Sequence, residues 1–411
     1  MRTSKQTIAL YSIAVLTLFL AWRVLSLGLA DHYAKENPAR ALFWRENHPQ
    51  ALFLMAEQHA KLKQWPEAQS FAKRALLANP LDGRALRILA QAEDAQGNAN
   101  NAQVLFQKAS ILAPRDALTH LWLLDYALKT KQAELAVKHL DALLRLQPSL
   151  LEKMQPQADL LAVNPATQKY MVKALSKSPP WRAPFLSGFS KAQYSLDSMA
   201  LLYNGISNSS SLELPEYQPW LQRLINEQRY MQAYVSWTNL IPKSQRAYLG
   251  NVFDGGFEIP QEEQQGQFAW STPPIKGARM YWASGGGQKG ENAFYVEFEG
   301  IRTPFSNLQQ VLTLPAGKWQ LKFRAKANRL DTSRGLVWRV SCLNDSSTLA
   351  ESQPMRGLFN WKPMQLDFEV PARCTGQRLT LTIPARIDAE TLIRGELWLD
   401  DGSIEALNNK L

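Results

Sequence analysis

Three prolines at a constant spacing constrain the fold of this chain more strongly than any other feature of its sequence. Pro80, Pro114 and Pro148 are 34 residues apart, and each closes a stretch with the apolar periodicity of a helix. A period of this length is typical of stacked helical repeats, in which neighbouring units bury a shared apolar face. We therefore expect three repeats of two helices each. Their windows are residues 49–80, 83–114 and 117–148.

The aligned windows share a small residue inside the second helix of each repeat. Ala68, Ala102 and Ala136 fill this column, where only a small side chain lets two helices approach closely. Together with the closing prolines, these residues resemble the tetratricopeptide (TPR) repeat. In the first helix, the family's aromatic and glycine positions hold other residues, namely Leu52 and Ala56, Leu86 and Ala90, and His120 and Leu124. The resemblance implies an all-α TPR-like solenoid over residues 31–148.

The TPR resemblance also implies a concave surface formed by the first helix of each repeat. The residues expected to contact a protein partner there are Phe53, Glu57, Arg84, Arg87, Gln91 and Asp125. This surface mixes charges around one aromatic side chain and two neighbouring arginines, which suits an extended peptide or a helix of a partner. Three repeats can equally serve as a spacer between other domains, and the sequence leaves both alternatives open.

An apolar stretch near the N-terminus is long enough to cross a bilayer. About 22 residues from Ile8 to Leu29 contain one charge, Arg23, close enough to the far end for its side chain to reach the interface. Arg2 and Lys5 precede the stretch, so the positive-inside rule predicts a cytoplasmic N-terminus.

Two interpretations of this stretch differ in whether it stays attached. Gly28, Leu29 and Ala30 offer the small residues that a signal peptidase requires. However, Arg23 interrupts the approach to that site, and the apolar stretch exceeds the usual length in a signal peptide. We favour an uncleaved anchor, with residues 1–30 as a cytoplasmic stub and single transmembrane helix of the inner (cytoplasmic) membrane. In both interpretations the rest of the chain is periplasmic or otherwise extracytoplasmic.

Residues 149–248 keep helical periodicity but lose the 34-residue register. We expect a degenerate helical extension that caps the solenoid or packs against the next domain. We assign its aromatic residues to the core or to a domain interface rather than to a ligand site. They are Tyr217, Trp220, Tyr230, Tyr234 and Trp237.

From residue 249 to residue 411 the apolar pattern changes to a period of two, interrupted by dense turn residues. Alternation over short segments is typical of an antiparallel β-sandwich. The segments begin at Phe294, Gln310, Trp319, Leu336, Met364, Leu379 and Glu396. The chain is therefore expected to be multidomain, with an N-terminal transmembrane helix, an all-α solenoid and a C-terminal all-β domain.

Four landmarks are spread along this β-rich region. They are the stretches 251–258 (NVFDGGFE), 314–321 (LPAGKWQL), 359–361 (FNW) and 395–401 (GELWLDD). In this order they resemble the galactose-binding-like jelly roll of many carbohydrate-binding modules. In several of those families an acidic residue of the first landmark and an aspartate of the last hold a structural calcium. Carried over, these positions are Glu258 and Asp400, hard oxygen ligands of the kind that calcium requires; a surface pair without metal is the alternative, and no other cofactor is expected.

Sugar recognition needs flat aromatic faces beside hydrogen-bonding side chains. The exposed candidates are Tyr281, Trp282 and Trp361, with Arg356 nearby in the sequence. Loop tryptophans of sandwiches also cap the core, which is the alternative for Trp282 and Trp361. The tryptophans inside strand patterns are assigned to the core. They are Trp319, Trp338 and Trp398.

The sequence offers little that points to an enzyme or to a nucleic-acid partner. The run 285–290 satisfies GxGxxG, but it lies among β-segments, and we interpret it as a flexible loop. All five histidines lie in the helical half or its approach, and no HExxH or GxSxG motif occurs. The net charge of +10 comes from scattered side chains, which an anionic lipid surface or an acidic polymer explains equally well. A glycosidase with two carboxylates in the jelly roll is the remaining enzyme hypothesis.

Cys342 and Cys374 are the two cysteines of the chain. In an exported domain they can form a disulfide, whereas in a cytosolic protein they would remain free thiols. Because both interpretations of the N-terminus place the body outside the cytoplasm, we expect the disulfide.

The combination of an anchor, a protein-binding groove and a sugar-binding fold resembles the accessory proteins of bacterial exopolysaccharide or cell-envelope assembly. This resemblance implies a membrane-anchored, non-catalytic scaffold that binds protein partners through the repeats and a polysaccharide through the jelly roll. The alternative is a purely protein–protein assembly factor of a secretion or synthase complex that binds no glycan.

Overall fold

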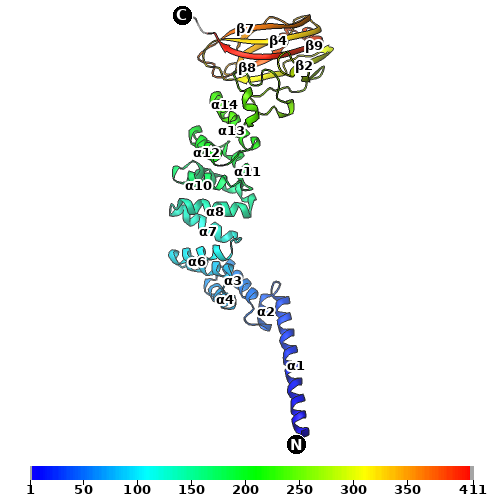
Figure 1. Cartoon of the computed structure of the whole chain (residues 1–411). Helices are drawn as coiled ribbons and strands as arrows, with labels where there is room; N and C mark the ends of the chain where they lie inside the picture. Colours follow the sequence, from blue (N-terminus) through cyan, green and yellow to red (C-terminus); the bar gives the residue numbers. More distant parts are fainter. Residues whose placement is uncertain (1, 408–411) are drawn as a thin grey trace. The chain divides into compact units, whose positions relative to one another are not determined.

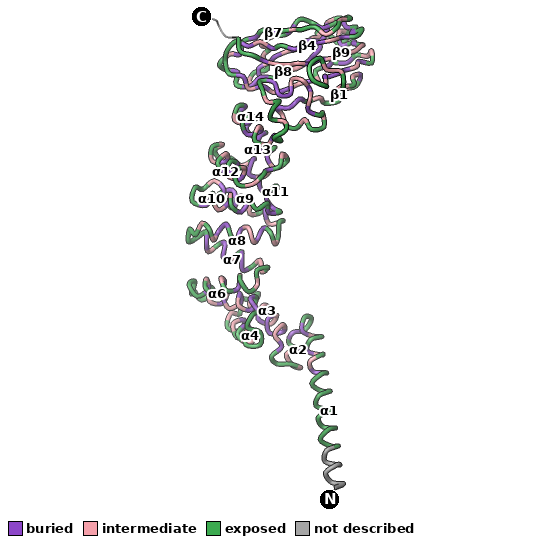
Figure 2. Tube along the Cα trace, in the orientation of Figure 1, coloured by how far each residue is buried: buried purple, intermediate pink, exposed green. Residues whose placement is uncertain are grey.

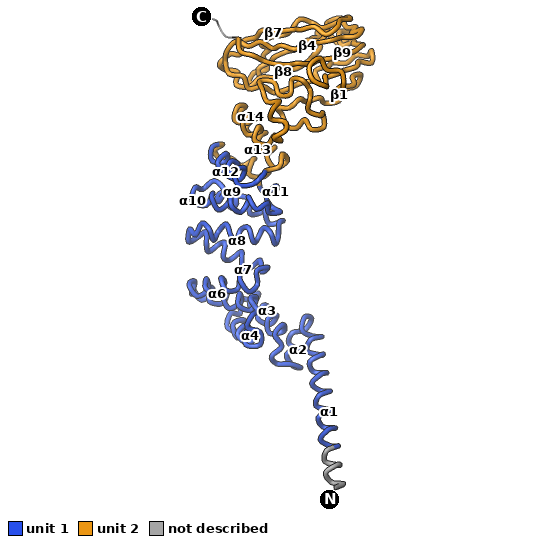
Figure 3. Tube along the Cα trace, in the orientation of Figure 1, with its two compact units in different colours: residues 1–185, 197–211 blue, residues 186–196, 212–411 orange. Residues whose placement is uncertain are grey.

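The computed structural model describes residues 2–407, with side chains from Leu10 onward, and divides into two compact units (Figure 3). The first unit comprises residues 1–185 and 197–211, and the second comprises residues 186–196 and 212–411. In the described residues the first unit is helical, whereas the second joins helices to a β-sandwich (Figure 1).

A single long helix, α1 (Arg2–Tyr33), begins the first unit and packs at its C-terminal end against the short helix α2 (Pro38–Trp44). The part Leu10–Tyr33 is long and apolar enough to cross a membrane, a property that it shares with signal sequences. Figure 2 shows α1 exposed over most of its length. The helix pairs of the three repeats follow, and they are α3 (Pro49–Lys61) with α4 (Trp65–Ala78), α5 (Gly83–Ala95) with α6 (Ala99–Leu112), and α7 (Ala117–Lys129) with α8 (Ala133–Leu146).

Residues spaced by 34 also cap the first helix of each repeat, a feature that the prolines alone do not reveal. His48, Asp82 and Asp116 are the N-caps of α3, α5 and α7. Each side chain accepts a backbone N–H of the first turn, which would otherwise lack a partner. A proline therefore separates two repeats, and a capping side chain begins the next helix. The 34-residue period follows from this junction between repeats.

The small residues at the helix crossings are buried as expected. Ala68, Ala102 and Ala136 lie in the interior of the helix stack. In the first repeat, the alanines of α4 pack against Leu52 of α3 and Ile88 of α5, which joins one repeat to the next. The expectation of a TPR-like solenoid is thereby confirmed.

The helical extension divides between the two units. After the third repeat come η1 (Pro148–Leu150), α9 (Leu151–Val163), α10 (Pro165–Leu175), α11 (Arg182–Phe189) and α12 (Leu196–Ser209). The next two helices, α13 (Leu214–Asn226) and α14 (Tyr230–Thr238), belong to the second unit. The reason is that Trp237 of α14 packs against Phe253 and Phe268, which lead into the sandwich. The second unit therefore includes residues that precede the domain boundary expected at residue 249.

The described part of the second unit contains nine strands in two antiparallel sheets. The strand order is β1-β2-β9-β4-β7 in the five-stranded sheet and β3-β8-β5-β6 in the other. The strands are β1 (Ala278–Ser284), β2 (Asn292–Arg302), β3 (Leu308–Leu312), β4 (Gly317–Thr332), β5 (Val337–Cys342), β6 (Thr348–Glu351), β7 (Gly357–Val370), β8 (Gln377–Thr382) and β9 (Leu392–Ala406). Short 3₁₀ turns are η2 (Lys243–Tyr248), η3 (Gln261–Glu263) and η4 (Asp388–Thr391). The expected jelly-roll sandwich is confirmed.

Apolar residues on the facing sides of the two sheets form the core of the sandwich. Phe294, Val296 and Phe298 alternate along β2 and all belong to this core. Trp319 and Trp338 belong to it too, as their strand patterns predict. Each sheet therefore has one apolar side turned to its partner and one side free for other contacts.

A disulfide joins Cys342 at the end of β5 to Cys374 in the loop before β8, with Cα atoms 5.6 Å apart. Directly after this bond, Thr375 Oγ1 donates to the backbone oxygen of Gln228, in the turn between α13 and α14. The disulfide therefore holds a loop of the sandwich against which the helix pair packs.

Candidate functional site

One side of the five-stranded sheet points away from the core and carries two rows of side chains. Along β9, Leu397 and Leu399 point into the core, so Glu396 and Trp398 point to the opposite side, because successive strand residues alternate. Strand register extends both rows over β1, β2, β9 and β4. We call this surface the outer sheet face. Its first row is Tyr281, Tyr295, Trp398 and Lys326, and its second row is Arg279, Glu297, Glu396 and Asn328.

In the first row, aromatic rings follow one another across three neighbouring strands. The ring centroids of Tyr281 and Tyr295 are 4.8 Å apart, and those of Tyr295 and Trp398 are 4.9 Å apart. On the fourth strand, Lys326 Nζ lies 4.8 Å from the centroid of the Trp398 ring, a cation–π arrangement. With strands about 4.8 Å apart, the row extends over about 14 Å.

The second row places charged and amide groups beside these rings. Arg279 Nη2 donates to Glu297 Oε2 at 2.9 Å. Glu396 accepts from the Tyr295 hydroxyl at 2.9 Å and from Asn328 Nδ2 at 2.8 Å. Burial and the neighbouring Glu396 carboxylate raise the pKa of Tyr295, so its hydroxyl remains a hydrogen-bond donor at neutral pH. Rings beside convergent polar groups can stack on a sugar and bind its hydroxyls.

Among the expected sugar-binding residues, Tyr281 lies on the outer sheet face, where its side chain is exposed on the edge strand β1. The expectation that Trp282 is exposed is wrong. Its ring points to the other side of β1 and packs against Phe257 and Phe294 in the core. Because Trp282 follows Tyr281 directly, strand alternation allows only one of them to face outward.

Trp361 and Arg356 lie outside the two rows. Trp361 is half-buried in β7, beside an irregularity in the pairing of that strand with β4. Arg356 is exposed just before β7 begins, where its Nη1 lies 3.5 Å from the backbone oxygen of Ser333. Both remain predictions from the sequence alone.

Sequence reasoning missed two members of the aromatic row, Tyr295 and Trp398. The assignment of Trp398 to the core is wrong, since it is half-buried and lies opposite Leu397 and Leu399. The alternation Glu396-Leu-Trp-Leu already contained the signal, because it groups Trp398 with a carboxylate rather than with the leucines. The pattern was missed because tryptophan was counted with the apolar residues that face the core.

The glycine-rich run 285–290 forms the connection between β1 and β2, and carboxylates hold it in place. Asp400 Oδ2 accepts the N–H groups of Gln288 and Lys289 at 2.6 and 2.8 Å. Gly290 has a φ of +90°, and a Cβ there would overlap a carboxylate oxygen of Glu258. The carboxylates of Asp400 and Glu258 therefore hold the loop in place. This differs from the flexible loop that its composition predicts.

The two residues proposed for calcium are the carboxylates of this loop anchor. Glu258 Oε1 accepts the N–H groups of Glu291 and Asn292 at 3.0 and 3.3 Å. A calcium ion needs several oxygen ligands turned toward it, whereas these carboxylate oxygens are turned toward N–H donors. Among the residues with described side chains, no group of three or more His, Cys, Asp or Glu is placed to hold a metal. These residues do not fit a calcium ion in this arrangement, and calcium binding remains a prediction of the sequence resemblance.

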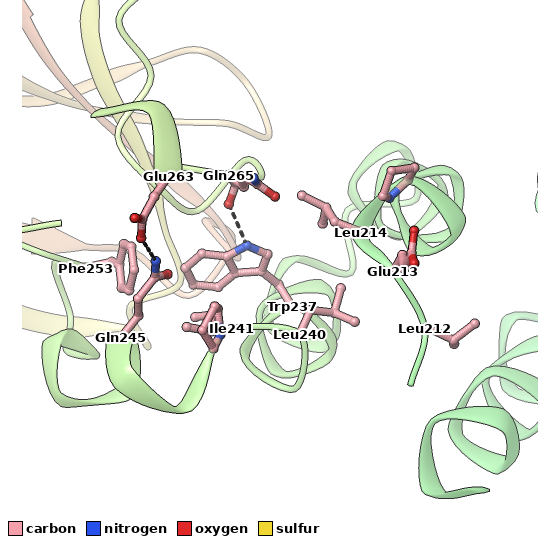
Figure 4. A pocket seen from close by; sticks show the side chains of 12 residues that line it. Leu212, Glu213, Leu214, Trp237, Leu240, Ile241, Gln245, Phe253, Glu263 and Gln265 are labelled. Carbon is pink, nitrogen blue, oxygen red and sulfur yellow. Dashed lines mark hydrogen bonds between the residues drawn. The ribbon is translucent and has the colours of Figure 1, made fainter. Parts of the chain in front are cut away.

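A pocket of about 400 Å³ lies between the α13–α14 pair and the chain that enters the sandwich (Figure 4). Trp237 Nε1 donates to the Gln265 backbone oxygen at 3.0 Å, and Gln245 Nε2 donates to Glu263 at 3.0 Å. Glu213, a third polar group at its rim, takes part in the capping box of α13. Each of these polar groups has a hydrogen-bond partner within the protein, and we assign the pocket to the packing of the helix pair.

In the repeats, the expected partner-binding residues mostly bind one another. Arg87 is only 3% exposed. Its guanidinium contacts Glu57 at 3.2 Å, Gln91 at 3.0 Å and the N-cap Asp116 at 2.9 Å. This network joins consecutive repeats, so these side chains stabilise the solenoid in the described structure.

Phe53 was chosen from the sequence as the aromatic anchor of the groove, but it is only 4% exposed. The guanidinium of Arg84 covers it, 4.3 Å from the ring centroid, and also donates to Gln50 and Asp82. The expectation that Phe53 offers its ring to a partner is therefore wrong for this conformation.

The third repeat leaves more of its concave side free. Leu118 and Leu121 of α7 are about half exposed, and Asp125 on the same helix is exposed and pairs with Lys129 at 2.6 Å. Leu118 and Leu121 are thus the accessible apolar part of the groove.

No family model matches this chain, and no curated protein matches it in sequence. Among solved structures, a CBM4 domain is 13% identical, covering 38% of this chain and 99% of its own with a TM-score of 0.29. A structure of TmCBM61 in complex with beta-1,4-galactotriose is 20% identical, covering 39% and 98% with a TM-score of 0.26. YrrB, a TPR protein with an unusual peptide-binding site, is 16% identical, covering 49% and 98% with a TM-score of 0.29.

The repeat period, the buried helix crossings and the two antiparallel sheets of the chain itself define a TPR-like helical solenoid combined with a jelly-roll sandwich.

Proposed function

We propose that this chain is a membrane-anchored, non-catalytic adaptor of the bacterial cell envelope. It holds a polysaccharide on the outer sheet face and a protein partner on the concave side of its repeats, in exopolysaccharide or cell-envelope assembly. The observation that carries the proposal is the first row of the outer sheet face, where the exposed Tyr281 and the half-buried Trp398 flank Tyr295, which is only 6% exposed, beside hydrogen-bonding groups.

The packing of α1 supports an uncleaved anchor in the inner membrane. Ser26 and Ala30 of this helix are buried, and Asp31 accepts from His48, the N-cap of α3, at 2.8 Å. Cleavage after Ala30 would remove buried residues and leave the start of the solenoid uncovered. The anchor therefore acts as the first structural element of the repeats.

The glycan half of the proposal is tested with the full chain in detergent on immobilised neutral and acidic polysaccharides. Trp398→Ala should weaken retention at least about tenfold, or about 1.4 kcal/mol, because it removes the ring that lies between Tyr295 and Lys326 in the first row. Lys326→Ala should weaken it less, through loss of the cation next to that ring.

The matched control is Lys322→Ala, since Lys322 lies on the same strand and the same side but pairs with Glu405, away from the two rows. Retention should be unchanged in this variant. If no polysaccharide binds the unmodified protein, or if all three variants bind alike, the outer sheet face is not a glycan site.

The second candidate is a protein–protein assembly factor of a secretion or synthase complex that binds no glycan. The exposed Leu118 and Leu121 favour it, because apolar side chains on a concave helix face suit a partner's helix.

A further inference from the structure

The start of the first unit contains a helical hairpin whose second arm runs back along the first. α2 begins beside Tyr33, where the Arg40 guanidinium lies 4.1 Å from that ring centroid. It ends at Trp44, whose ring centroid is 5.9 Å from that of Trp22. At 1.5 Å per residue, Trp22 lies about 16 Å nearer the N-terminus along α1 than Tyr33. Figure 1 shows α2 beside the end of α1.

The length of the membrane span decides where this hairpin lies relative to lipid. A hydrocarbon core of about 30 Å requires about 20 helical residues. The apolar stretch of the sequence extends from Ile8 to Leu29, so the span ends at about Leu29. Trp22 then lies about 10 Å inside the outer boundary. Because the ring of Trp44 contacts that of Trp22, the C-terminal end of α2 reaches into the outer leaflet, within about 10 Å of that boundary.

The side chains at this end of α2 suit a membrane interface better than water. Phe43 is 81% exposed and contacts Trp44 edge-on, with ring centroids 5.5 Å apart. Phenylalanine and tryptophan are the residues that interfacial helices place at the boundary of headgroups and acyl chains. Arg40 and Arg45, both exposed, flank the two rings and can reach lipid phosphates.

We propose that α2 is an interfacial helix, which inserts Phe43 and Trp44 into the outer leaflet beside α1. The partner is the lipid bilayer itself, and the contact rests on the proposed membrane anchoring. Ala41 of α2 also packs with Ala34, directly after α1, and with Ala51 of α3, so the same helix lies between the anchor, the lipid and the first repeat. The lipid contact thereby orients the solenoid at the membrane surface.

The test uses the full chain in vesicles of phosphatidylcholine and phosphatidylglycerol. Three variants each add one cysteine, Phe43→Cys, Leu18→Cys or Leu77→Cys. They are labelled with bimane under non-reducing conditions, which keep Cys342 and Cys374 paired, and lipids with a nitroxide on the acyl chain serve as quenchers. Leu18 reports the span itself. Leu77, on α4, is the control because it is 85% exposed and thus as accessible as Phe43.

We expect the label to lose fluorescence at positions 18 and 43 and to keep it at position 77. Quenching at position 18 without quenching at position 43 overturns the interfacial helix but leaves the anchor intact. The same holds if the emission at position 43 shifts to the blue without quenching, because protein or a second copy of the chain then covers that position. Absence of quenching at all three positions overturns the anchor and the interfacial helix together. Equal quenching at 43 and 77 also contradicts the inference, because lipid contact would not be confined to α2.

Discussion

At the scale of single residues, each unit contains buried polar side chains that affect its stability. Asp254 is the clearest case in the sandwich, because its carboxylate accepts the N–H groups of Glu258 and Ile259 and the amide of Gln264. Its backbone oxygen accepts from Trp270 Nε1 at 2.9 Å. Burial raises the pKa of Asp254 to about 7, against the effect of its three donors.

Replacing Asp254 should destabilise the sandwich strongly. In Asp254→Ala the N–H groups of Glu258 and Ile259 lose their acceptor while still enclosed, so we expect a loss of about 2–4 kcal/mol in the free energy of unfolding. Denaturant unfolding of the full chain in detergent measures it. The control Asp367→Ala removes an exposed carboxylate bound by Gln320 and should cost about 0.5 kcal/mol or less. Equal midpoints for both variants would contradict this role.

In the solenoid, His139 makes stability depend on pH. Burial, with the nearby His120, lowers the pKa of His139 from 6.5 to about 4, and the two Nδ1 atoms lie 2.9 Å apart. The folded state thus binds fewer protons than the unfolded chain between these values. Stability from this group is fully present above pH 6.5 and is lost as the pH falls from 6.5 through 4.

Thermal unfolding between pH 7.5 and 4 checks this expectation. The melting temperature of the solenoid should fall less steeply with decreasing pH in His139→Gln than in the unmodified protein. His59→Gln, which changes a less buried histidine on α3, should keep the original slope. An unchanged slope in the His139 variant would disprove the assignment.

At the scale of elements, the disulfide and the α13–α14 pair form one assembly. Cys374 precedes Thr375 and Gly376, and a Cβ at Gly376 would collide with the ring of Tyr230 in α14. Asn344, two residues after Cys342, donates to Gln228 in the turn before α14 at 2.7 Å. The bond therefore supports both the sandwich and the surface on which the helix pair rests.

Reduction of this bond should weaken the second unit and spare the first. Opening a cross-link with a sequence separation of 32 residues costs about 2–4 kcal/mol. Calorimetry of the full chain with and without reductant should show one unfolding transition moving to lower temperature, and hydrogen exchange should rise in α14. Non-reducing peptide mapping provides the direct check, because two free thiols in the native protein would refute the pairing.

Most elements could be predicted from the sequence, and the exceptions share a physical cause. The seven alternating segments correspond to β2, β3, β4, β5, β7, β8 and β9. The two that were missed, β1 and β6, are edge strands with no fully buried residue, unlike the edge strands β3 and β7, which were found. An edge strand pairs on one side only and buries less, so its apolar alternation is weaker. The helix pair α13–α14 was expected as helices that cap the solenoid or pack against the next domain. The sequence could not choose between the two because Phe253 and Phe268, the packing partners of Trp237, lie farther along the chain.

At the scale of the whole molecule, the two candidate functions differ in the binding surfaces that they use. The adaptor needs both the outer sheet face and the concave side of the repeats, whereas the protein–protein assembly factor needs no glycan-binding surface. Purification from native membranes after crosslinking should recover a protein partner, and the double variant Leu118→Glu and Leu121→Glu should lose it, because charges replace the apolar contact. Leu201→Glu, at an exposed leucine of α12, is the control and should keep the partner. Recovery of the same complex from the double variant would exclude this part of the groove.

The sequence by itself determined the order of apolar N-terminal helix, repeats and sandwich, because apolar periodicity is a local property that each segment carries along its own length. The tertiary structure decided which of these side chains are available. Phe53 and Arg87 carry the residue types of a binding groove, yet neighbouring repeats enclose them. Trp398 is apolar in a strand pattern, yet register places it beside Tyr295 on the outer sheet face. Such availability depends on what packs against a residue from distant parts of the chain, which no local pattern contains.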